Sequence, residues 1–417
     1  MTVTTAAPSG IPFSALGAAR LLAGTGAGHL DLAGHRRVHG MPGRHDATQL
    51  AGVLDAVRLL GRGGAAFPVA TKLRGTAVGS RTHVLVNGSE GEPASHKDRA
   101  LMRLAPHLVL DGALAVARAL ETRRVTVAVA DPASYRSLHS AIRERTDAKR
   151  VRLVRHDHGF VGGEVRAVTR ALSGGPAVPP GRRVLPTVHG IDDRPTFASN
   201  VETFAQIGLL TLLGVDDFAS VGSADEPGTT LLTVIGSVPH AGVVEVPTGI
   251  PLTAIAGEGP GPLLVGGYHG TWVADPRGLT LSRPALRAAG VPLNAGVLAR
   301  LPESTCALGE VAAVSGWLAD QSVGQCGPCF FGLPALAESV RGLVAGRDLL
   351  PEAARRVGLL PGRGACAHPD GSAAFVRSAL AAMPGEIETH RRHGGCGRAV
   401  LGALPLGSST PDRRAVA

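Results

Sequence analysis

Residues 48–154 alternate between helical and strand patterns, and this alternation restricts the possible folds more than any other feature of the chain. The expected elements are a helix over 48–60, strands over 82–87, 125–129 and 151–154, and an amphipathic helix over 106–118. The strands are short and apolar, and each is followed by a loop or a helix. This order predicts an α/β sheet whose ligand lies at the ends of the strands.

Two glycine-rich blocks flank the first of these strands. Residues 61–68 read GRGGAAFP and end at Lys72, and residues 87–93 read NGSEGEP and end at Lys97. The chain has three lysines against 39 arginines, so two of its three lysines stand beside these blocks. Because glycines let a backbone approach an anion and a lysine neutralises it, the blocks predict a phosphate-bearing cofactor. The first block differs from the common dinucleotide fingerprint, and a helix-capping turn explains it about equally well.

The second block also gathers carboxylates. Glu90, Glu92 and Asp98 lie within nine residues, directly after the expected strand. Carboxylates there can accept hydrogen bonds from ribityl or ribose hydroxyls and from a nicotinamide amide, which leaves the phosphate to the glycines and Lys72. A solvated charged loop is the alternative. A further polar cluster, ASNVET over 198–203, opens an apolar helix, with a simple helix cap as its alternative.

All five cysteines lie in the last third of the chain, which does not resemble a disulfide framework. Cys326 and Cys329 form a Cys-x-x-Cys pair, and Cys366 follows in a second loop. Without a surrounding βαβ pattern, the three suit an iron–sulfur cluster, which normally takes four thiolates. Cys396, in a glycine-rich loop, and Cys306 are the candidates for the fourth thiolate, and Cys306 is equally readable as a buried helical residue.

Composition limits the remaining possibilities. A chain of 417 residues predicts more than one domain. The formal charge of +9 comes from scattered arginines without an aromatic ladder, so no nucleic-acid partner is expected, and an anionic cofactor or an acidic partner explains part of the charge. No stretch approaches the roughly 18 apolar residues of a membrane helix, and no secretory signal is visible. These features predict a reducing cytoplasmic compartment.

The rest of the chain divides by pattern. The expected parts are an N-terminal arm up to about residue 45, a linker over 216–228, a small β-rich unit with strands over 229–236, 243–246 and 262–265, a helical region over 304–392, and a disordered tail after Pro405.

Taken in order, the blocks resemble one family. The motifs are GRGGAAFPVATK, NGSEGEPASHKDR with MRLAPHLVLDGA, FVGGE, SNVET, QCGPC and GRGACAHPDG. From about residue 48 to 393 the chain resembles the NADH-binding flavoprotein subunit of respiratory complex I and the related subunits of hydrogenases and formate dehydrogenases. The resemblance implies a Rossmann-like FMN domain (46–222), a β-grasp domain of the soluble-ligand-binding type (228–285) and a four-helix-like domain with a [4Fe–4S] cluster (296–400). An extension (1–45) and a tail (401–417) complete the chain.

The resemblance also assigns roles by position. The residues implied to bind FMN or NADH are Gly61, Gly63, Gly64, Phe67, Lys72, Asn87, Ser89, Glu90, Phe160, Glu164, Ser199, Asn200 and Thr203. Of these, Glu90 is the expected catalytic carboxylate. Cys326, Cys329 and Cys366 match three cluster ligands, and Cys396 is the expected fourth, with Cys306 or a non-cysteine ligand as alternatives.

Three departures from the family pattern bear on function. Val323 stands where the family has the first cysteine of its Cys-x-x-Cys-x-x-Cys motif. Phe67 is retained, but the other aromatic residues that stack on NADH, after Lys72 and before Pro186, are absent; each lost stack removes about 1 kcal/mol. Val165 replaces the second of two paired glutamates. Besides these three departures, Ser89 replaces an aspartate of the family and Phe160 replaces a tyrosine.

The resemblance thus implies a divergent NADH dehydrogenase-like flavoprotein, which oxidises NADH through FMN and sends single electrons through an iron–sulfur cluster to a protein or quinone-linked acceptor. The expected partner is a ferredoxin-like or membrane redox protein, at which the chain would sit peripherally. Two alternatives stay open: a relay fed by a redox protein without NADH, and a non-catalytic structural protein.

Overall fold

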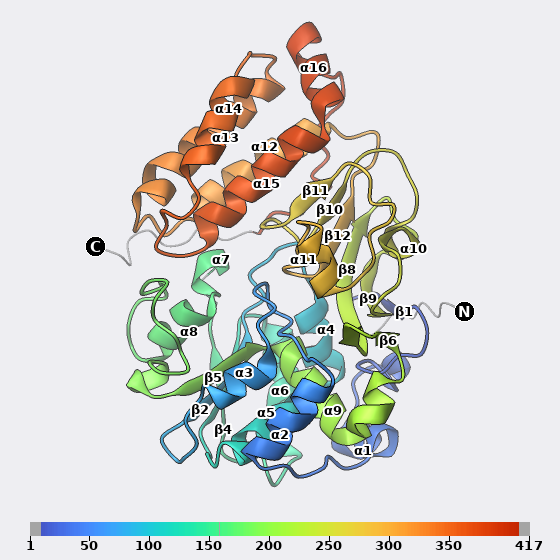
Figure 1. Ribbon diagram of the computed structural model, residues 1–417, viewed down its shortest axis with the longest axis vertical. Helices are drawn as coiled ribbons and strands as arrows, with labels where there is room; N and C mark the ends of the chain where they lie inside the picture. Colours follow the sequence, from blue (N-terminus) through green and yellow to red (C-terminus); the bar gives the residue numbers. More distant parts are fainter. Residues whose placement is uncertain (1–9, 158, 408–417) are drawn as a thin grey trace.

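The computed structural model describes residues 10–157 and 159–407 (Figure 1). A four-stranded parallel sheet has the order β4-β3-β2-β5. Its strands are β2 (His83–Gly88), β3 (Val125–Val129), β4 (Val151–Arg155) and β5 (Thr196–Asn200). The central strands β2 and β3 are almost wholly buried, which explains their continuous apolar sequences. The three expected strands of this region are confirmed.

Helices cover both faces of this sheet because successive strand residues point to opposite sides. Val84 and Val86 belong to the core shared with α5 (Pro106–Ala119) and α9 (Val201–Ala219). Leu85, on the other face, packs with α8 (Val165–Leu172). The remaining helices of this part are α1 (Leu32–His39), α2 (Ala47–Ala56), α3 (Val69–Arg74), α4 (Lys97–Leu104), α6 (Pro132–Arg143) and α7 (Gly159–Gly162). The mixed α/β class expected from the sequence is confirmed.

Two glycines allow α5 and α9 to cross closely. A Cβ on Gly112 would stand 1.8 Å from the Phe204 carbonyl oxygen, and one on Gly208 would stand 2.5 Å from the Leu108 carbonyl oxygen. No side chain fits at either position, so the contact requires glycine. The crossing fixes the position of α9 against the face of the sheet formed by β2 and β5.

A second, mixed sheet has the order β1-β9-β8-β12-β10-β11. Its strands are β1 (Phe13–Ala15), β8 (Thr229–Gly236), β9 (Gly242–Pro247), β10 (Leu263–Val265), β11 (Thr271–Val273) and β12 (Val297–Arg300). The sheet extends beyond the expected unit at both ends: the region expected to be an arm supplies β1, which pairs with β9, and β12 lies past residue 285. The expected linker over 216–228 contains the short strands β6 (Gly222–Ser223) and β7 (Glu226–Pro227).

Both faces of this second sheet are buried. Leu263 and Val265 pack beneath α10 (Leu252–Ala256) and α11 (Arg283–Ala288), whereas Leu264 faces the C-terminal helices. Figure 1 shows that the second sheet contacts the C-terminal helices at one end and the parallel-sheet region at the other. The second sheet therefore connects the two other parts of the molecule.

The C-terminal part is helical, as expected. Its helices are α12 (Ala307–Asp320), a π-helical turn (Pro328–Gly332), α13 (Leu333–Val344), α14 (Leu350–Leu359), α15 (His368–Ala382) and α16 (Pro384–His393). Residues 401–407 of the expected tail pack on these helices: the Leu401 and Ala403 amides donate to Glu310 Oε1 (3.0 Å each), and Trp317 Nε1 donates to the Gly407 carbonyl (3.2 Å). The remainder of the tail lies outside the described residues.

Within the described ranges, no single helix has the length and hydropathy of a membrane span. Helices α4 and α5 reach them only as a pair, and they meet at an angle of 95°.

Candidate functional site

The carboxyl ends of β2 and β5 form the centre of the candidate site. From β2 the chain adds β3 and β4 on one side and then returns to place β5 on the other side, so the sheet has its switch point between β2 and β5. Here Asn87 and Asn200 are direct partners in the register. Open α/β sheets bind ligands at such a point. Two asparagines from separate sequence motifs therefore lie side by side at the strand ends, where the sequence predicts the ligand.

The GRGG loop lies against the start of α9. The Arg62 amide donates to Thr203 Oγ1 (2.8 Å), and a Cβ on Gly63 would be 3.6 Å from the Asn200 Cβ. The Gly61 amide closes the loop on the Phe67 carbonyl (2.9 Å), which leaves the Phe67 ring 47% exposed. Asn200 is also the N-cap of α9, because its side chain accepts from the Thr203 amide (3.3 Å). The helix cap expected as the alternative for residues 198–203 is thus present, and it lies beside the glycine loop.

Lys72 carries a half-buried ammonium group below this loop. Its Nζ donates to the Ala198 carbonyl (2.9 Å) and lies 5.8 Å from the centre of the Phe197 ring. Burial lowers the pKa of Lys72 to about 8. Among the described residues no carboxylate forms an ion pair with this lysine. A partly desolvated cation without an anion is the arrangement expected of an anion-binding residue.

Glu90 is held by the start of α4. Its carboxylate accepts from Ser95 Oγ (2.6 Å), from the Asp98 amide (3.0 Å) and from the Arg99 amide (3.1 Å), and it pairs with the Arg99 guanidinium (3.3 Å). Its side chain is only 5% exposed. These contacts give Glu90 a helix-capping function in addition to the catalytic one expected from the resemblance.

Glu92 faces the second sheet instead. Its Oε2 accepts from the Tyr268 amide (2.9 Å), and burial raises the pKa of Glu92 to about 7. The glycine at 267 is required here, since a Cβ would stand 2.7 Å from Glu92 Oε2. The second block therefore joins the two sheets through Glu92.

A buried group of charges lies behind the site. Lys97 Nζ pairs with Asp98 Oδ1 and with Glu202 Oε2 (2.9 Å each), and Asn200 Nδ2 donates to Asp98 Oδ2 (3.2 Å). Burial raises the pKa of Asp98 to about 6, although Lys97 opposes the rise. Because Glu202 Oε1 also accepts from the Leu231 amide (3.0 Å), the group fixes Asn200 relative to β8.

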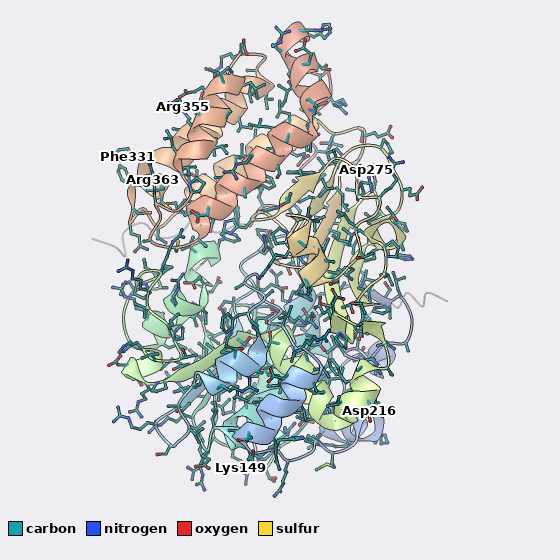
Figure 2. The ribbon with its side chains drawn as sticks, in the orientation of Figure 1. Lys149, Asp216, Asp275, Phe331, Arg355 and Arg363 are labelled. Carbon is teal, nitrogen blue, oxygen red and sulfur yellow. The ribbon has the colours of Figure 1, made fainter. Side chains whose placement is uncertain are left out.

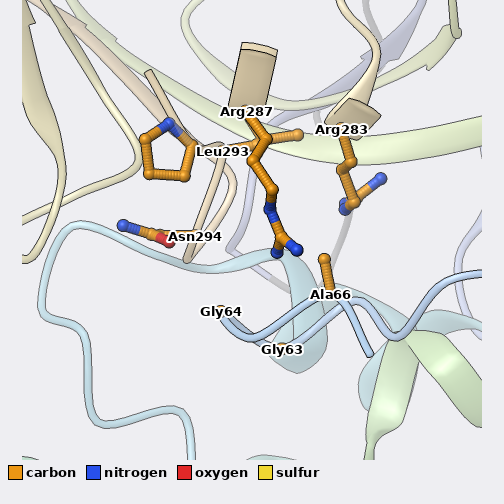
Figure 3. A pocket seen from close by; sticks show the side chains of 8 residues that line it. Gly63, Gly64, Ala66, Arg283, Arg287, Leu293 and Asn294 are labelled. Carbon is orange, nitrogen blue, oxygen red and sulfur yellow. The ribbon is translucent and has the colours of Figure 1, made fainter. Parts of the chain in front are cut away.

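Arg62 forms a second buried ion pair that the sequence does not indicate. It pairs with Glu226, which also pairs with Arg283 (2.5 Å). Arg62 Nε and Nη2 are buried and have no partner among the described residues. A small cavity lies between the glycine loop and α11, and Figure 3 shows Arg287 extending across it toward Gly63 and Gly64. Arg287 Nη2 donates to the Ala65 carbonyl (2.8 Å), so the cavity is rimmed by positive charge.

The segment over 159–166 lies against the loop that follows β2. Asn87 Nδ2 donates to the Gly163 carbonyl (2.9 Å), and a Cβ on Gly163 would meet the Ser89 carbonyl oxygen at 3.3 Å. Glu164 Oε1 accepts from Arg166 Nε (2.9 Å), while its Oε2 is buried and has no partner in the part of the chain that the structure describes. Asn87, Ser89 and Glu164 are thereby brought together. Ser199 is buried one residue before Asn200 in β5.

Two cysteine loops meet near this segment. Cys329 and Cys366 are buried and Cys326 is partly exposed, and the Cys329 amide donates to the Cys326 carbonyl (3.1 Å). Burial raises the pKa of Cys329 to about 12, and the neighbouring thiols of Cys326 and Cys366 add to the rise. The three cysteines are therefore close enough to interact. The Val323 side chain supplies no ligand atom.

The cysteine loops lie close to the segment that carries Glu164. Burial raises the pKa of Cys366, and the negative charge of Glu164 raises it further. Arg182 donates to the carbonyls of Gly364 (2.9 Å) and Cys366 (2.7 Å), and Gln325 Nε2 donates to the Pro179 carbonyl (3.0 Å). The loop over 173–190 thus holds both cysteine loops beside Glu164.

Phe160 belongs to an aromatic cluster between the two regions. Its ring packs edge-on against His269, Trp317 and His368, with centroids 4.8, 5.2 and 5.7 Å away. His269 Nε2 and His368 Nδ1 lie 3.1 Å apart, and burial lowers the pKa of His368 to about 4, so this pair is uncharged at neutral pH. The sequence did not indicate either histidine.

Cys396 lies in a different group of side chains. Its Sγ, the Sγ of Cys306, a carboxylate oxygen of Glu386 and a ring nitrogen of His390 are all within 4.8 Å of one another. Cys326, Cys329 and Cys366 are not members of this group. The expectation that Cys396 is the fourth cluster ligand therefore gains no support from its position.

Residues 54–209 match the Nuo51 FMN-binding domain, and residues 309–390 match the NADH-ubiquinone oxidoreductase-F iron-sulfur binding region. The NADH-quinone oxidoreductase F subunit of Mycobacterium tuberculosis is 30% identical over 371 residues, which cover 81% of this chain and 83% of that protein. The chain belongs to the NADH-quinone oxidoreductase F-subunit family. NADP-reducing hydrogenase subunit HndC of Solidesulfovibrio fructosivorans is 27% identical over 331 residues, 71% of this chain and 66% of that protein.

A solved member of this fold is the NAD+-reducing [NiFe]-hydrogenase in its air-oxidized state. One of its chains superposes with a TM-score of 0.73 and 27% identity, covering 83% of this chain. This chain spans only 63% of that hydrogenase chain. The family membership agrees with the order of motifs in the sequence, and the two matched regions place an FMN-binding domain and an iron-sulfur binding region in one chain.

Proposed function

We propose that this protein oxidises NADH through bound FMN and passes electrons singly through an iron–sulfur cluster to a redox partner. The observation that carries the proposal is the contact between the two candidate sites. Glu164 lies within electrostatic reach of Cys366. Arg182 donates to the Cys366 carbonyl, and Arg166 donates to the carbonyl of the neighbouring Gly181 (2.6 Å), so the loop that carries Arg182 contacts both segments. A flavin and a cluster held by these residues would be neighbours, as a relay requires.

The residues at the switch point fit FMN. Within the described part of the chain, Lys72 offers an ammonium group without a carboxylate partner, and Glu164 Oε2 is a buried acceptor without a donor. The glycine loop leaves its backbone open beside Asn200. We infer that Lys72 and Gly61, Gly63 and Gly64 hold the phosphate and ribityl chain. Asn87, Ser89, Ser199, Asn200 and Thr203 would hold the ring system.

The three cysteines fit an iron–sulfur cluster. Burial disfavours free thiolates at Cys329 and Cys366, and a cationic iron centre would offset that cost. We infer that Cys326, Cys329 and Cys366 are ligands, and that the position of Val323 leaves the cluster with altered ligation.

FMN, when bound, supplies the hydride acceptor and the conversion from two-electron to one-electron transfer. The protein orients it and sets its surroundings. Glu90 acts through the start of α4, which it caps, so we infer that it positions the loop over 88–93. Phe160 and the uncharged His269 and His368 pack together between Glu164 and the helical region, where they would keep water away from bound cofactors.

The partner is inferred from the surface beside the cluster. Phe330 and Phe331 directly follow Cys329 and are 63% and 72% exposed, and Figure 2 shows Phe331 at the outer edge of the helical region. Together with the net charge of +9, this favours an acidic, ferredoxin-like protein.

We also propose that the second sheet is a soluble-ligand-binding β-grasp domain, and that the protein acts in the cytoplasm or at the membrane through its partner.

A second candidate function is a relay that receives electrons from a redox protein and not from NADH. The observation in its favour is that Phe67 is 47% exposed and makes no ring contact with a second aromatic side chain among the described residues, while the exposed residue before Pro186 is Leu185 and not an aromatic one. Adenine stacking would be weaker there by about 1 kcal/mol for each missing ring.

Reconstitution of the full chain under anaerobic conditions with FMN, iron and sulfide tests the proposal. We expect bound flavin and iron in the wild type, loss of flavin in Asn200→Ala, and loss of iron with retained flavin in Cys366→Ala. Binding of neither flavin nor iron by the wild type would reject it.

A further inference from the structure

We propose that Cys306, Glu386, His390 and Cys396 form a metal site for one zinc-like divalent ion, separate from the iron–sulfur cluster. Their ligand atoms lie within 4.8 Å of one another, and Cys306 and His390 are buried. The proposal does not depend on the function proposed above.

The spacing of three of the ligand atoms is that of a single tetrahedral ion, and Cys396 Sγ lies within 4.8 Å of all three. Cys306 Sγ lies 3.3 Å from His390 Nε2 and 3.8 Å from Glu386 Oε1, and His390 Nε2 lies 3.5 Å from Glu386 Oε1. Zinc–sulfur bonds near 2.3 Å and zinc–nitrogen or zinc–oxygen bonds near 2.0 Å set tetrahedral ligands about 3.3–3.8 Å apart. Little rearrangement is therefore needed for an ion to enter.

The histidine is already in the tautomer that binds a metal. His390 Nδ1 lies 2.7 Å from the Val344 carbonyl oxygen at the end of α13. A carbonyl can only accept, so Nδ1 carries the proton and Nε2 presents its lone pair to Cys306 Sγ. A second hydrogen bond of this kind is typical of metal-bound histidines.

The charges also balance. Two thiolates and one carboxylate exceed the charge of a divalent ion by one negative charge. Arg398 supplies the compensating positive charge, because its guanidinium pairs with Glu386 Oε2 while Oε1 faces the other ligands. A site with two sulfurs, one imidazole and one carboxylate suits zinc, and four protein ligands leave no open position. The site is therefore structural.

The four residues come from segments that the ion would join. Cys306 is the N-cap of α12, Glu386 and His390 are one turn apart on α16, and Cys396 lies in the loop that follows α16. The Cys306 amide donates to the Ala399 carbonyl (2.8 Å). The ion would thus fix the start of residues 396–407, the segment that continues to Glu310 and Trp317.

Elemental analysis of the anaerobically purified full chain tests the proposal. We expect one zinc per chain in addition to iron. Cys396→Ser and His390→Gln should lower the zinc content by at least about 10-fold and leave iron and flavin unchanged, whereas His393→Gln, an exposed histidine on the same helix, should change nothing.

Cobalt provides a readout that does not require the purified zinc form. Co²⁺ added to the metal-stripped chain should give the visible absorption of tetrahedral cobalt with a thiolate charge-transfer band, and Glu386→Gln should weaken binding without abolishing the fold. Absence of both zinc and the cobalt band would overturn the proposal. Loss of iron in place of zinc in Cys396→Ser would also overturn it and would assign Cys396 to the cluster.

Discussion

Replacement of Lys72 by methionine should stabilise the protein and weaken flavin binding at the same time. In the flavin-free protein the Lys72 ammonium is half-buried against the Ala198 carbonyl, and its pKa falls from 10.5 to about 8 because of burial. A fall of this size corresponds to roughly 3 kcal/mol of cost to the folded state. Methionine keeps the packing volume and removes the charge.

The sign of the pH dependence follows from these values. The folded-state pKa of Lys72 lies below its unfolded-state value, so the cost is fully present below pH about 8 and disappears as the pH rises toward 10.5. We therefore expect flavin-free Lys72→Met to be more stable than the wild type at pH 7, by up to about 3 kcal/mol, with a smaller difference at pH 10.

Flavin affinity should change in the opposite direction. A charge-assisted hydrogen bond to phosphate contributes about 1.5–3 kcal/mol, so the Kd for FMN should rise by roughly 10- to 150-fold. Denaturant unfolding of the flavin-free chain and fluorescence titration with FMN measure the two effects. Lys149→Met, at an exposed lysine far from the site (Figure 2), should alter neither. A destabilised variant with unchanged FMN affinity would show that Lys72 is neither a desolvated cation in the flavin-free protein nor a phosphate ligand.

Three further predictions concern the relay. Val323→Cys should raise the iron content per chain and slow cluster loss during gel filtration, because it supplies a fourth thiolate; unchanged iron would show that this position does not face the cluster. Glu90→Gln should lower the free energy of unfolding by about 1–3 kcal/mol, because it weakens the contacts of Glu90 with α4. Stopped-flow measurement should find flavin reduction by NADH slowed by less than about 10-fold. A larger loss of rate at unchanged stability would give Glu90 the catalytic function. Phe331→Ser should slow electron transfer to an acidic ferredoxin and leave flavin reduction by NADH unchanged. Equal rates of electron transfer to the ferredoxin in the variant and the wild type would exclude this surface as the docking site.

The parallel sheet and the meeting of two of the predicted site residues could be predicted because local patterns determine them. The buried strands β2 and β3 read as apolar runs, and the register of β2 with β5 then brings Asn87 and Asn200 together. Contacts between distant segments had no such signal. The three residues of β1 pair with β9 more than 200 positions away, and the pairing of Arg62 with Glu226 depends on how the second sheet docks.

The cysteines show the same limit. Cys326 and Cys329 lie within a single turn of the chain, so their common site is visible in the sequence. The choice between Cys396 and Cys306 as the fourth ligand could not be made from spacing, because it depends on the packing of α16 against α12. The structure brings both cysteines to Glu386 and His390, a combination that no sequence motif had indicated.

Anaerobic stopped-flow absorbance of the reconstituted protein mixed with NADH tests the central claim most directly. We expect rapid bleaching of the flavin band followed by loss of cluster absorbance, with the second phase absent in Cys366→Ala. A flavin that is bound but not bleached by NADH would contradict the proposed activity and would identify a redox protein as the donor.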